Sequence, residues 1–195
     1  MKSVACGARH LPDRFLHPWR RQSSLRRLAE LPRPGKVLFV CHANICRSSY
    51  AAAVARRLLP LPAGAVMSAG FIGPTRSSPP EAVAVAAEHG IDLAPHRSQL
   101  IGLEQLRAAD LVIVMDRQQR RRLVSGRPGL RNRVVLLGDL DPEPITRRAV
   151  LDPVEQPADV FRTCYDRIDR CVGALAASWR ESPGDDAKRE GRKLP

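Results

Sequence analysis

A cysteine and an arginine separated by five residues, Cys41 and Arg47, are the side chains of this sequence best suited to chemistry on a phosphate group. A loop between a strand and a helix directs backbone N–H groups inward at the positive end of the helix dipole, which makes a cradle for an oxyanion. The same field favours a cysteine as the nucleophilic thiolate. An arginine fork holds two oxygens of a phosphoryl group. The pair therefore predicts displacement on a phosphate ester through a phosphocysteine intermediate.

The flanking sequence predicts the elements that would position this pair. Residues 36–40 are apolar and β-branched, which is typical of a buried strand, and residues 49–59 are rich in helix-forming residues. A cysteine and an arginine at this spacing also occur by chance in many chains. The preceding strand, the following helix and Ser48 beside Arg47 favour a site over coincidence.

The run from Val40 to Ser48 resembles the signature of the low-molecular-weight protein tyrosine phosphatase family, Val-Cys-x-Gly-Asn-x-Cys-Arg-Ser. Ala43 stands where the family has glycine, and backbone geometry that glycine tolerates costs alanine energy. Asn44 accepts a left-handed conformation, so the turn remains compatible with the sequence. The resemblance implies a catalytic Cys41 and Arg47 and a phosphate-binding loop that contains His42, Ala43, Asn44, Ile45, Cys46 and Ser48.

The likeness to bacterial members of this family covers about residues 36–179. Further matching stretches lie at residues 67–70, 88–92, 96–98 and 109–116. In the family, two serines and a histidine hold the loop asparagine, and a serine hydroxyl donates to the thiolate. The resemblance assigns these supporting roles to Ser48, Ser68 and His96 around Asn44.

The leaving oxygen needs a proton, so the site requires a general acid on a loop that reaches across the pocket. Three aspartates follow the fourth predicted strand, Asp139, Asp141 and Asp152. The family places its acid in an Asp-Pro pair shortly before the last helix, and Asp152 fits best because Pro157 opens that helix. Asp141, which also precedes a proline, is the alternative. The chosen aspartate would then activate the water that hydrolyses phosphocysteine.

Other positions bear on substrate and redox behaviour. Val154 stands where aryl-specific members have an aromatic residue after the Asp-Pro pair, while Phe71 is available as another wall and His42 adds a polar edge. We therefore expect phosphotyrosine to be recognised with altered specificity. The resemblance also implies a reversible disulfide between Cys41 and Cys46; the alternative is that Cys46 is a small buried hydrophobe.

Strands alternate with helices along the rest of the chain. The predicted strands are 36–40, 65–69, 111–115 and 134–137, and the predicted helices are 49–59, 81–89, 103–109, 117–123 and 158–179. This order predicts an α/β fold, a four-stranded parallel sheet with helices on both faces. The resemblance makes it a flavodoxin-like sheet. Ligands of such sheets bind at the carboxyl ends of the strands, where Cys41 lies.

Three segments are expected: a flexible basic extension over residues 1–35, a phosphatase domain over 36–180 and a disordered tail over 181–195. Residues 1–36 carry nine Lys and Arg against two acidic residues. Proline interrupts this extension, although residues 24–31 are compatible with a short helix. The extension is either solvated or an arm for anionic surfaces. It is also compatible with an upstream start codon read as protein.

Composition excludes several classes of protein. The net charge is +12, but aromatic residues make up only 4% of the chain, so a base-stacking nucleic-acid surface is not expected. No apolar run predicts a membrane span. Five cysteines, an odd number without regular pairing, favour a reducing cytoplasm. No Cys/His spacing resembles a zinc site, and the expected mechanism needs no cofactor or metal.

The leading interpretation is a phosphatase acting on phosphotyrosine-containing proteins, with a tyrosine kinase as one candidate substrate. An arsenate reductase-like enzyme on the same scaffold is an alternative, but no cysteine lies between His89 and Asn132, where further redox cysteines are needed. A catalytically weak phosphate-binding regulator, with the loop disabled by Ala43, is another. A nucleic-acid binder acting through the basic extension is the third, and steep salt dependence would test it.

Overall fold

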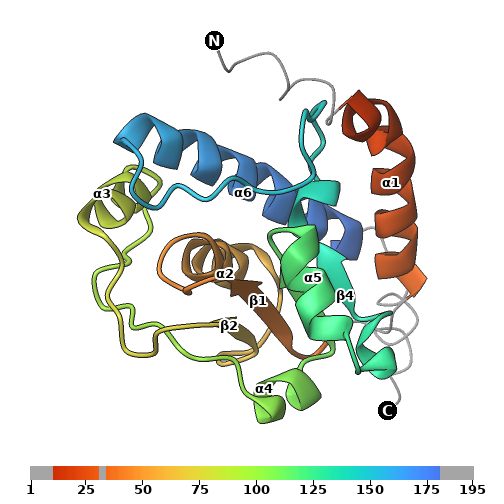
Figure 1. Cartoon of the computed structure of the whole chain (residues 1–195), viewed down its shortest axis with the longest axis horizontal. Coiled ribbons are helices and arrows are strands. Elements are labelled where there is room, and N and C mark those ends of the chain that lie inside the picture. The colour runs from red at the N-terminus through yellow and green to blue at the C-terminus, as the bar shows by residue number, and fades with distance from the viewer. Residues whose placement is uncertain (1–10, 31–33, 181–195) are drawn as a thin grey trace, which may run out of the picture.

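Four short parallel strands form the central sheet of the computed structural model, which describes residues 11–30 and 34–180. They are β1 (Val37–Cys41), β2 (Val66–Gly70), β3 (Leu111–Val114) and β4 (Val134–Leu136), in the order β2-β1-β3-β4. All residues of β1 and β3 are buried, as expected for strands covered on both faces. The predicted four-stranded parallel sheet is confirmed (Figure 1).

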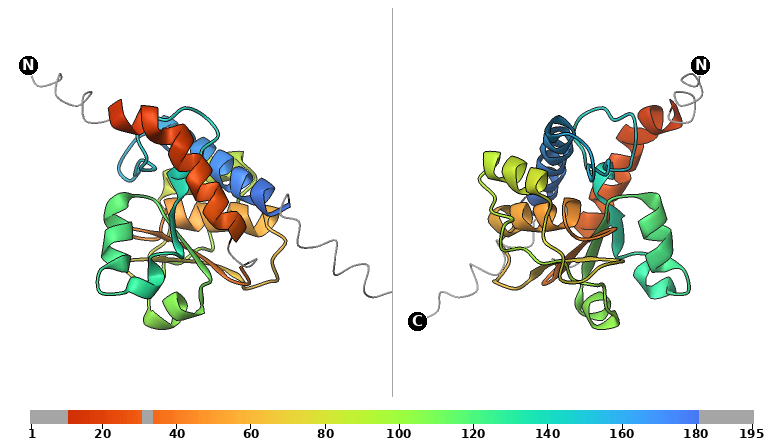
Figure 2. Two further views of the ribbon diagram at one scale, coloured as in Figure 1. Left: turned by 90° about the vertical axis from the view of Figure 1, so that its right-hand side faces the viewer. Right: turned by 60° about the vertical axis from the view of Figure 1, so that its left-hand side comes forward.

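Helices cover both faces of the sheet (Figure 2). Alternate residues of β1 pack on opposite sides, Phe39 in one hydrophobic cluster and Val40 in the other. The first cluster is completed by α2 (Arg47–Leu58), α3 (Pro80–Glu88) and α6 (Ala158–Arg180). The second is completed by α4 (Leu103–Ala108) and α5 (Arg117–Val124). Two short 3-10 helices, η1 (Pro128–Leu130) and η2 (Leu137–Asp139), flank β4.

The sequence predicts the positions of the strands and helices well, but it misplaces the end of β1 and the start of α2, which bound the loop after β1. The strand predicted over 36–40 is shifted by one residue, so Cys41 is its last residue. The helix predicted from residue 49 begins at Arg47. Between them only residues 42–46 form the loop, and both Cys41 and Arg47 are therefore fixed by regular secondary structure.

The N-terminal extension differs from the expected flexible segment. Leu11–Glu30 form α1, a helix of 20 residues that lies against α6 and η2 (Figure 2). His17 and Leu28 are buried by this packing, and His17 Nε2 lies 2.9 Å from the carbonyl oxygen of Asp141. These tertiary contacts offset the helix-breaking tendency of Pro18. Residues 1–10, 31–33 and the predicted tail 181–195 lie outside the described residues.

No helix within residues 11–30 and 34–180 combines the length and the apolar character needed to cross a bilayer.

Candidate active site

The loop over residues 42–46 is held against the end of β2 by a close backbone approach. Cys41 pairs with Gly70 in the sheet register. A Cβ atom on Gly70 would lie 2.8 Å from both Ala43 C and Asn44 N, so only glycine leaves room for the loop. Just beyond, the Phe71 N–H donates to the carbonyl oxygen of His42 over 2.7 Å. The loop thus has one position relative to the strand ends.

Asn44 forms the turn of this loop, with φ at 56° in the left-handed region. The side chain is fully buried, and each polar group has a partner. The Asn44 N–H donates to Cys41 Sγ over 3.2 Å, and Nδ2 donates to Ser48 Oγ over 2.8 Å. Oδ1 accepts from the Gln99 N–H over 2.8 Å. The carbonyl oxygen lies 2.6 Å from His96 Nε2. Asn44 therefore ties the loop to α2 and to the segment around residues 96–99.

The hydroxyl of Ser48 is oriented toward the cysteine. Because Asn44 Nδ2 donates to Ser48 Oγ, the Ser48 proton is free to donate elsewhere. Cys41 Sγ is 3.0 Å away, and the next acceptor, the carbonyl oxygen of Ala69, is 3.4 Å away. Cys41 Sγ thus has two donors, one from the backbone and one from a hydroxyl.

Ser68 does not take the supporting position that the family resemblance implies. It is buried in β2, but within the described residues no hydrogen bond joins its hydroxyl to Asn44. Instead, the backbone N–H of Gln99 donates a hydrogen bond to the side-chain oxygen of Asn44. A backbone donor carries no sequence signal, so reasoning from residue types could not have found it.

Arg47 and Asp152 meet at the opening of a small cavity of about 110 Å³ whose lining includes Cys41. One terminal nitrogen of Arg47 donates to Asp152 Oδ2, and the other donates to the carbonyl oxygen of Val150 over 3.2 Å. The Arg47 side chain is 5% exposed and that of Asp152 42% exposed. Arg47 Nε is buried and has no partner among the described residues. The Arg47 side chain is thus enclosed, and its two terminal nitrogens are held by Asp152 and Val150.

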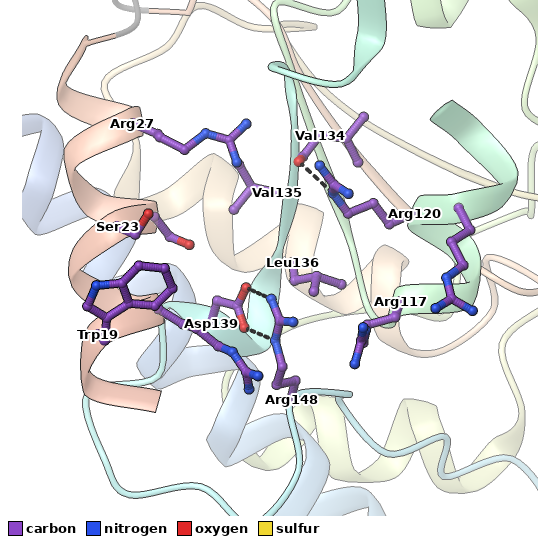
Figure 3. A pocket seen from close by; sticks show the side chains of 13 residues that line it. Trp19, Ser23, Arg27, Arg117, Arg120, Val134, Val135, Leu136, Asp139 and Arg148 are labelled. Atoms are coloured by element: carbon purple, nitrogen blue, oxygen red, sulfur yellow. Dashed lines mark hydrogen bonds and ion pairs between the residues drawn. The ribbon is translucent and has the colours of Figure 1, made fainter. Parts of the chain in front are cut away.

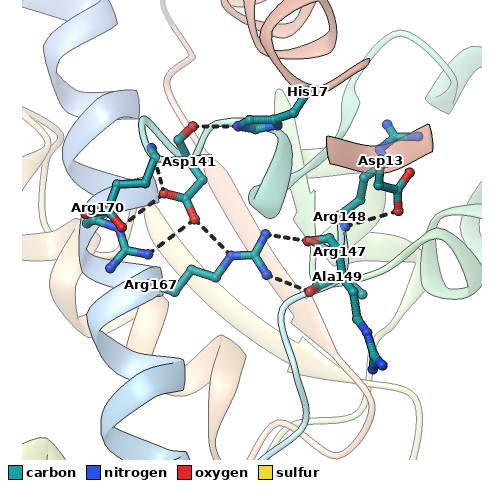
Figure 4. A network of polar contacts seen from close by, with 9 residues as sticks. Asp13, His17, Asp141, Arg147, Arg148, Ala149, Arg167 and Arg170 are labelled. Atoms are coloured by element: carbon teal, nitrogen blue, oxygen red, sulfur yellow. Dashed lines mark hydrogen bonds and ion pairs between the residues drawn. The ribbon is translucent and has the colours of Figure 1, made fainter. Parts of the chain in front are cut away.

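Asp139 and Asp141 are structural ion-pair partners. Asp139 accepts two hydrogen bonds from Arg148, at 2.7 and 2.5 Å. Asp141 is 1% exposed and accepts from Arg167 and Arg170 of α6 (Figure 4). Neither aspartate lines the cavity beside Cys41. Of the three aspartates, Asp152 alone lies at the cavity, so the alternative Asp141 is not supported.

Comparison with known proteins identifies this arrangement. The family model described as low molecular weight phosphotyrosine protein phosphatase matches residues 36–184. The chain belongs to this family. It is 37% identical over 140 residues to "Probable low molecular weight protein-tyrosine-phosphatase EpsP" of Ralstonia nicotianae, covering 71% of this chain and 91% of that protein. Helix α1 lies outside the matched residues.

Solved structures of the family share the fold. The tyrosine phosphatase Wzb from Escherichia coli K30, in complex with sulphate, superposes with a TM-score of 0.67 at 25% identity, over 74% of this chain and 98% of that one. The YwlE arginine phosphatase from Geobacillus stearothermophilus superposes with a TM-score of 0.65 at 25% identity, over 82% of this chain and 98% of that one. Both phosphotyrosine and phosphoarginine enzymes are thus built on this scaffold.

Two further groups of this family member have pKa values shifted by burial. Burial lowers the pKa of His96, although the hydrogen bond to the carbonyl oxygen of Asn44 opposes that shift. The neutral imidazole carries its proton on Nε2, because a carbonyl oxygen can only accept. Burial, and next the neighbouring Cys41, raise the pKa of Cys46. Cys46 is therefore an inert thiol in the reduced loop.

The rim of the site is mixed in character. Ile72, Arg76 and Val154 line the cavity beside Cys41. Phe71 does provide an aromatic ring, but the guanidinium of Arg122 lies 4.4 Å from its centre. With His42 exposed beside them, the rim is more cationic and less flat than an aromatic-walled pocket. Phe71 and Arg122 are 51 residues apart in the sequence, and the sequence did not reveal their contact.

Proposed function

We propose that this protein is a protein-tyrosine phosphatase that hydrolyses phosphotyrosine and other aryl phosphates through a phosphocysteine formed on Cys41. The observation that supports this most strongly is the pair of donors on Cys41 Sγ, the Asn44 N–H and the Ser48 hydroxyl, in a cavity that Arg47 also lines. Donors of this kind stabilise sulfur as thiolate, both before attack and when it leaves again.

Substrate binding is expected to break the ion pair of Arg47 with Asp152. A phosphate dianion entering the cavity offers oxygens to the same guanidinium and reaches the positive end of α2. Asp152 is then displaced toward the leaving oxygen while Val150 keeps its hydrogen bond from Arg47. Binding and positioning of the acid are thereby coupled.

The chemistry then needs only residues of this chain. The Cys41 thiolate forms a bond to phosphorus, the bond from phosphorus to the aryl oxygen breaks, and protonated Asp152 gives its proton to that oxygen. In the second step Asp152 takes a proton from water, the water oxygen attacks phosphorus, and the sulfur–phosphorus bond breaks. Inorganic phosphate and the Cys41 thiolate are the products, and the Ser48 hydroxyl stabilises the thiolate.

The rim favours phosphotyrosine in acidic protein segments over phosphoarginine. Arg76 lines the cavity and Arg122 lines the groove that shares Arg47 and Asp152 with it, so a substrate whose leaving group is itself a guanidinium meets like charge. A phosphotyrosine-bearing protein, with a tyrosine kinase as one candidate, meets no such repulsion. The cytoplasm suits the free thiols of Cys41, Cys46, Cys164 and Cys171.

Hydrolysis of one peptide sequence carrying phosphotyrosine, phosphoserine or phosphoarginine tests this proposal. We expect turnover of phosphotyrosine only, and a loss of at least about 1,000-fold in Cys41→Ser. Cys171→Ser, a matched change in the buried core of α6, should retain turnover. Faster turnover of the phosphoarginine peptide than of the phosphotyrosine peptide would change the assignment to an arginine phosphatase. Phosphate binding without hydrolysis by the wild type would identify a regulatory protein instead.

A further inference from the structure

A second pocket, of about 340 Å³, lies between α1, α5 and β4 (Figure 3). Its lining contains six arginines, Arg20, Arg27, Arg117, Arg120, Arg121 and Arg148. The only carboxylate in the described lining is Asp139, which is already paired with Arg148. Arg20 is paired with Asp13 of its own helix. Four guanidiniums therefore converge on this pocket without a carboxylate partner among the described residues.

The surroundings of these four arginines do not neutralise them. Arg27 donates to the carbonyl oxygens of Arg131 and Asn132, and Arg120 donates to that of Val134. Within residues 11–30 and 34–180, Arg117 and Arg121 are exposed, and their guanidinium groups have no hydrogen-bond partner. Burial lowers the pKa of Arg120, and the neighbouring charges of Arg27 and Arg148 add to that shift. An anion in the pocket would relieve this repulsion.

Five of the thirteen residues that line the pocket belong to α1, which lies outside the residues matched by the family model. The α1 side contributes Trp19, Ser23 and Ser24 beside its two arginines. Figure 3 shows Trp19 and Ser23 on one wall, facing Arg117 and Arg120 on the other. The pocket is therefore a feature of this chain's own extension, and hydroxyl and guanidinium donors face it from both sides.

The second pocket and the active-site groove share α5 as a wall. Arg117, Arg120 and Arg121 face the second pocket. Asp116, Gln118, Gln119 and Arg122 line the groove that also contains Arg47 and Asp152. The loop before Asp152 is divided in the same way, because Arg148 lines one pocket and residues 149–152 line the other. A single extended segment crossing α5 would reach both.

We propose that this arginine pocket binds a second phosphoryl group of the same protein substrate while the first occupies the loop at Cys41. A phosphotyrosine carries nearly two negative charges and three acceptor oxygens, which suit several guanidinium forks and the hydroxyls of Ser23 and Ser24. The inference rests on the proposed phosphatase function and names its substrate class, a multiply phosphorylated protein segment. Two contacts on one chain raise affinity through effective concentration.

Steady-state kinetics on peptides with one or two phosphotyrosines test the pocket. We expect the doubly phosphorylated peptide to have a KM about tenfold lower in the wild type. The double variant Arg117→Gln, Arg121→Gln should lose that advantage and leave kcat and the KM for the single phosphotyrosine unchanged. The matched control is Arg107→Gln, because Arg107 is an exposed arginine of α4 outside both pockets. This variant should keep the lower KM for the doubly phosphorylated peptide.

The outcomes separate this inference from the proposed function. Equal KM values for the two peptides in the wild type, with normal turnover, would overturn the docking site and leave the phosphatase assignment intact. Inorganic tripolyphosphate supplies the same chemistry from a free anion. As a docking competitor it should raise the KM of the doubly phosphorylated peptide by a larger factor than that of the singly phosphorylated one, which it affects only through the loop at Cys41. If tripolyphosphate instead changes kcat on a small aryl phosphate, the pocket binds a free effector and the proposal fails.

Discussion

Arg47 holds two points of one loop, the carboxylate of Asp152 and the carbonyl oxygen of Val150. The guanidinium comes from the first residue of α2, and the loop comes from the chain just before α6. The residue proposed to bind phosphate thus also sets the position of the residue proposed to protonate the leaving group. This contact makes Arg47 and Asp152 a coupled pair.

Asp152→Asn removes the proton donor but keeps the shape of the side chain. We expect the first step, measured as the burst of released phenol, to slow by about 100- to 1,000-fold for poor leaving groups. For nitrophenol, which leaves without a proton, the loss should be less than about tenfold. Asp159→Asn, on the exposed side of α6, is the control. A deficit of equal size for every leaving group would contradict an acid role for Asp152.

Gly70→Ala tests the close approach that positions the loop. The added Cβ would meet backbone atoms of Ala43 and Asn44 at 2.8 Å, so the loop must shift. We expect kcat/KM to fall by about 10- to 100-fold, because sub-ångström displacements of reacting groups are costly. Gly173→Ala in α6 meets no atom within 4 Å and should raise the melting temperature slightly without changing turnover. Wild-type kinetics in Gly70→Ala would refute this view of the loop.

His96 should make the protein less stable as the pH falls below neutrality. Its pKa is lowered in the folded state by burial, whereas the unfolded value is about 6.5. Between the folded and unfolded pKa values the unfolded chain binds a proton that the folded chain does not, so stability falls as the pH drops through this window. His96→Gln keeps a donor for Asn44 without titrating. Melting temperatures at pH 7.5 and 5.5 should differ less in this variant than in the wild type. Equal differences would show that His96 is not the responsible group.

The described cysteines should differ sharply in reactivity. Burial raises the pKa of Cys164 and of Cys171 to about 12, and that of Cys46 further. Only thiolates react rapidly with iodoacetate, so peptide mapping after brief treatment at neutral pH should find label on Cys41 and not on these three. Inorganic phosphate should protect Cys41. Comparable labelling of Cys46 would contradict its assignment as an inert thiol.

Much of the site could be predicted from local sequence. The short apolar strand, the loop and the helix after it are encoded within residues 36–59, and periodicity alone located the other strands. Choosing Asp152 over Asp141 needed the family resemblance, which places the acid in an Asp-Pro pair shortly before the last helix, together with the expected position of that helix. The sequence could not show that Asp141 forms ion pairs with Arg167 and Arg170. These partners lie 26 and 29 residues further along the chain.

The extension shows the limit of local reasoning. Prolines and arginines between residues 11 and 30 suggest a flexible chain, and the helix forms because His17 and Leu28 become buried against distant parts of the fold. Asn44 is a second case, since its partners include the backbone of Gln99 rather than Ser68. Tertiary contacts and backbone hydrogen-bond donors produce no pattern of residue types in the local sequence, so local reasoning could not predict either feature.

Phosphocysteine is the central chemical claim, and mass spectrometry can detect it directly. Asp152→Asn should hydrolyse the intermediate slowly, so acid quenching during turnover of a nitrophenyl phosphate should trap it. The predicted result is the mass of one phosphoryl group on the peptide that contains Cys41, absent in Cys41→Ser. Turnover without any phosphorylated Cys41, or turnover that persists in Cys41→Ser, would contradict the mechanism.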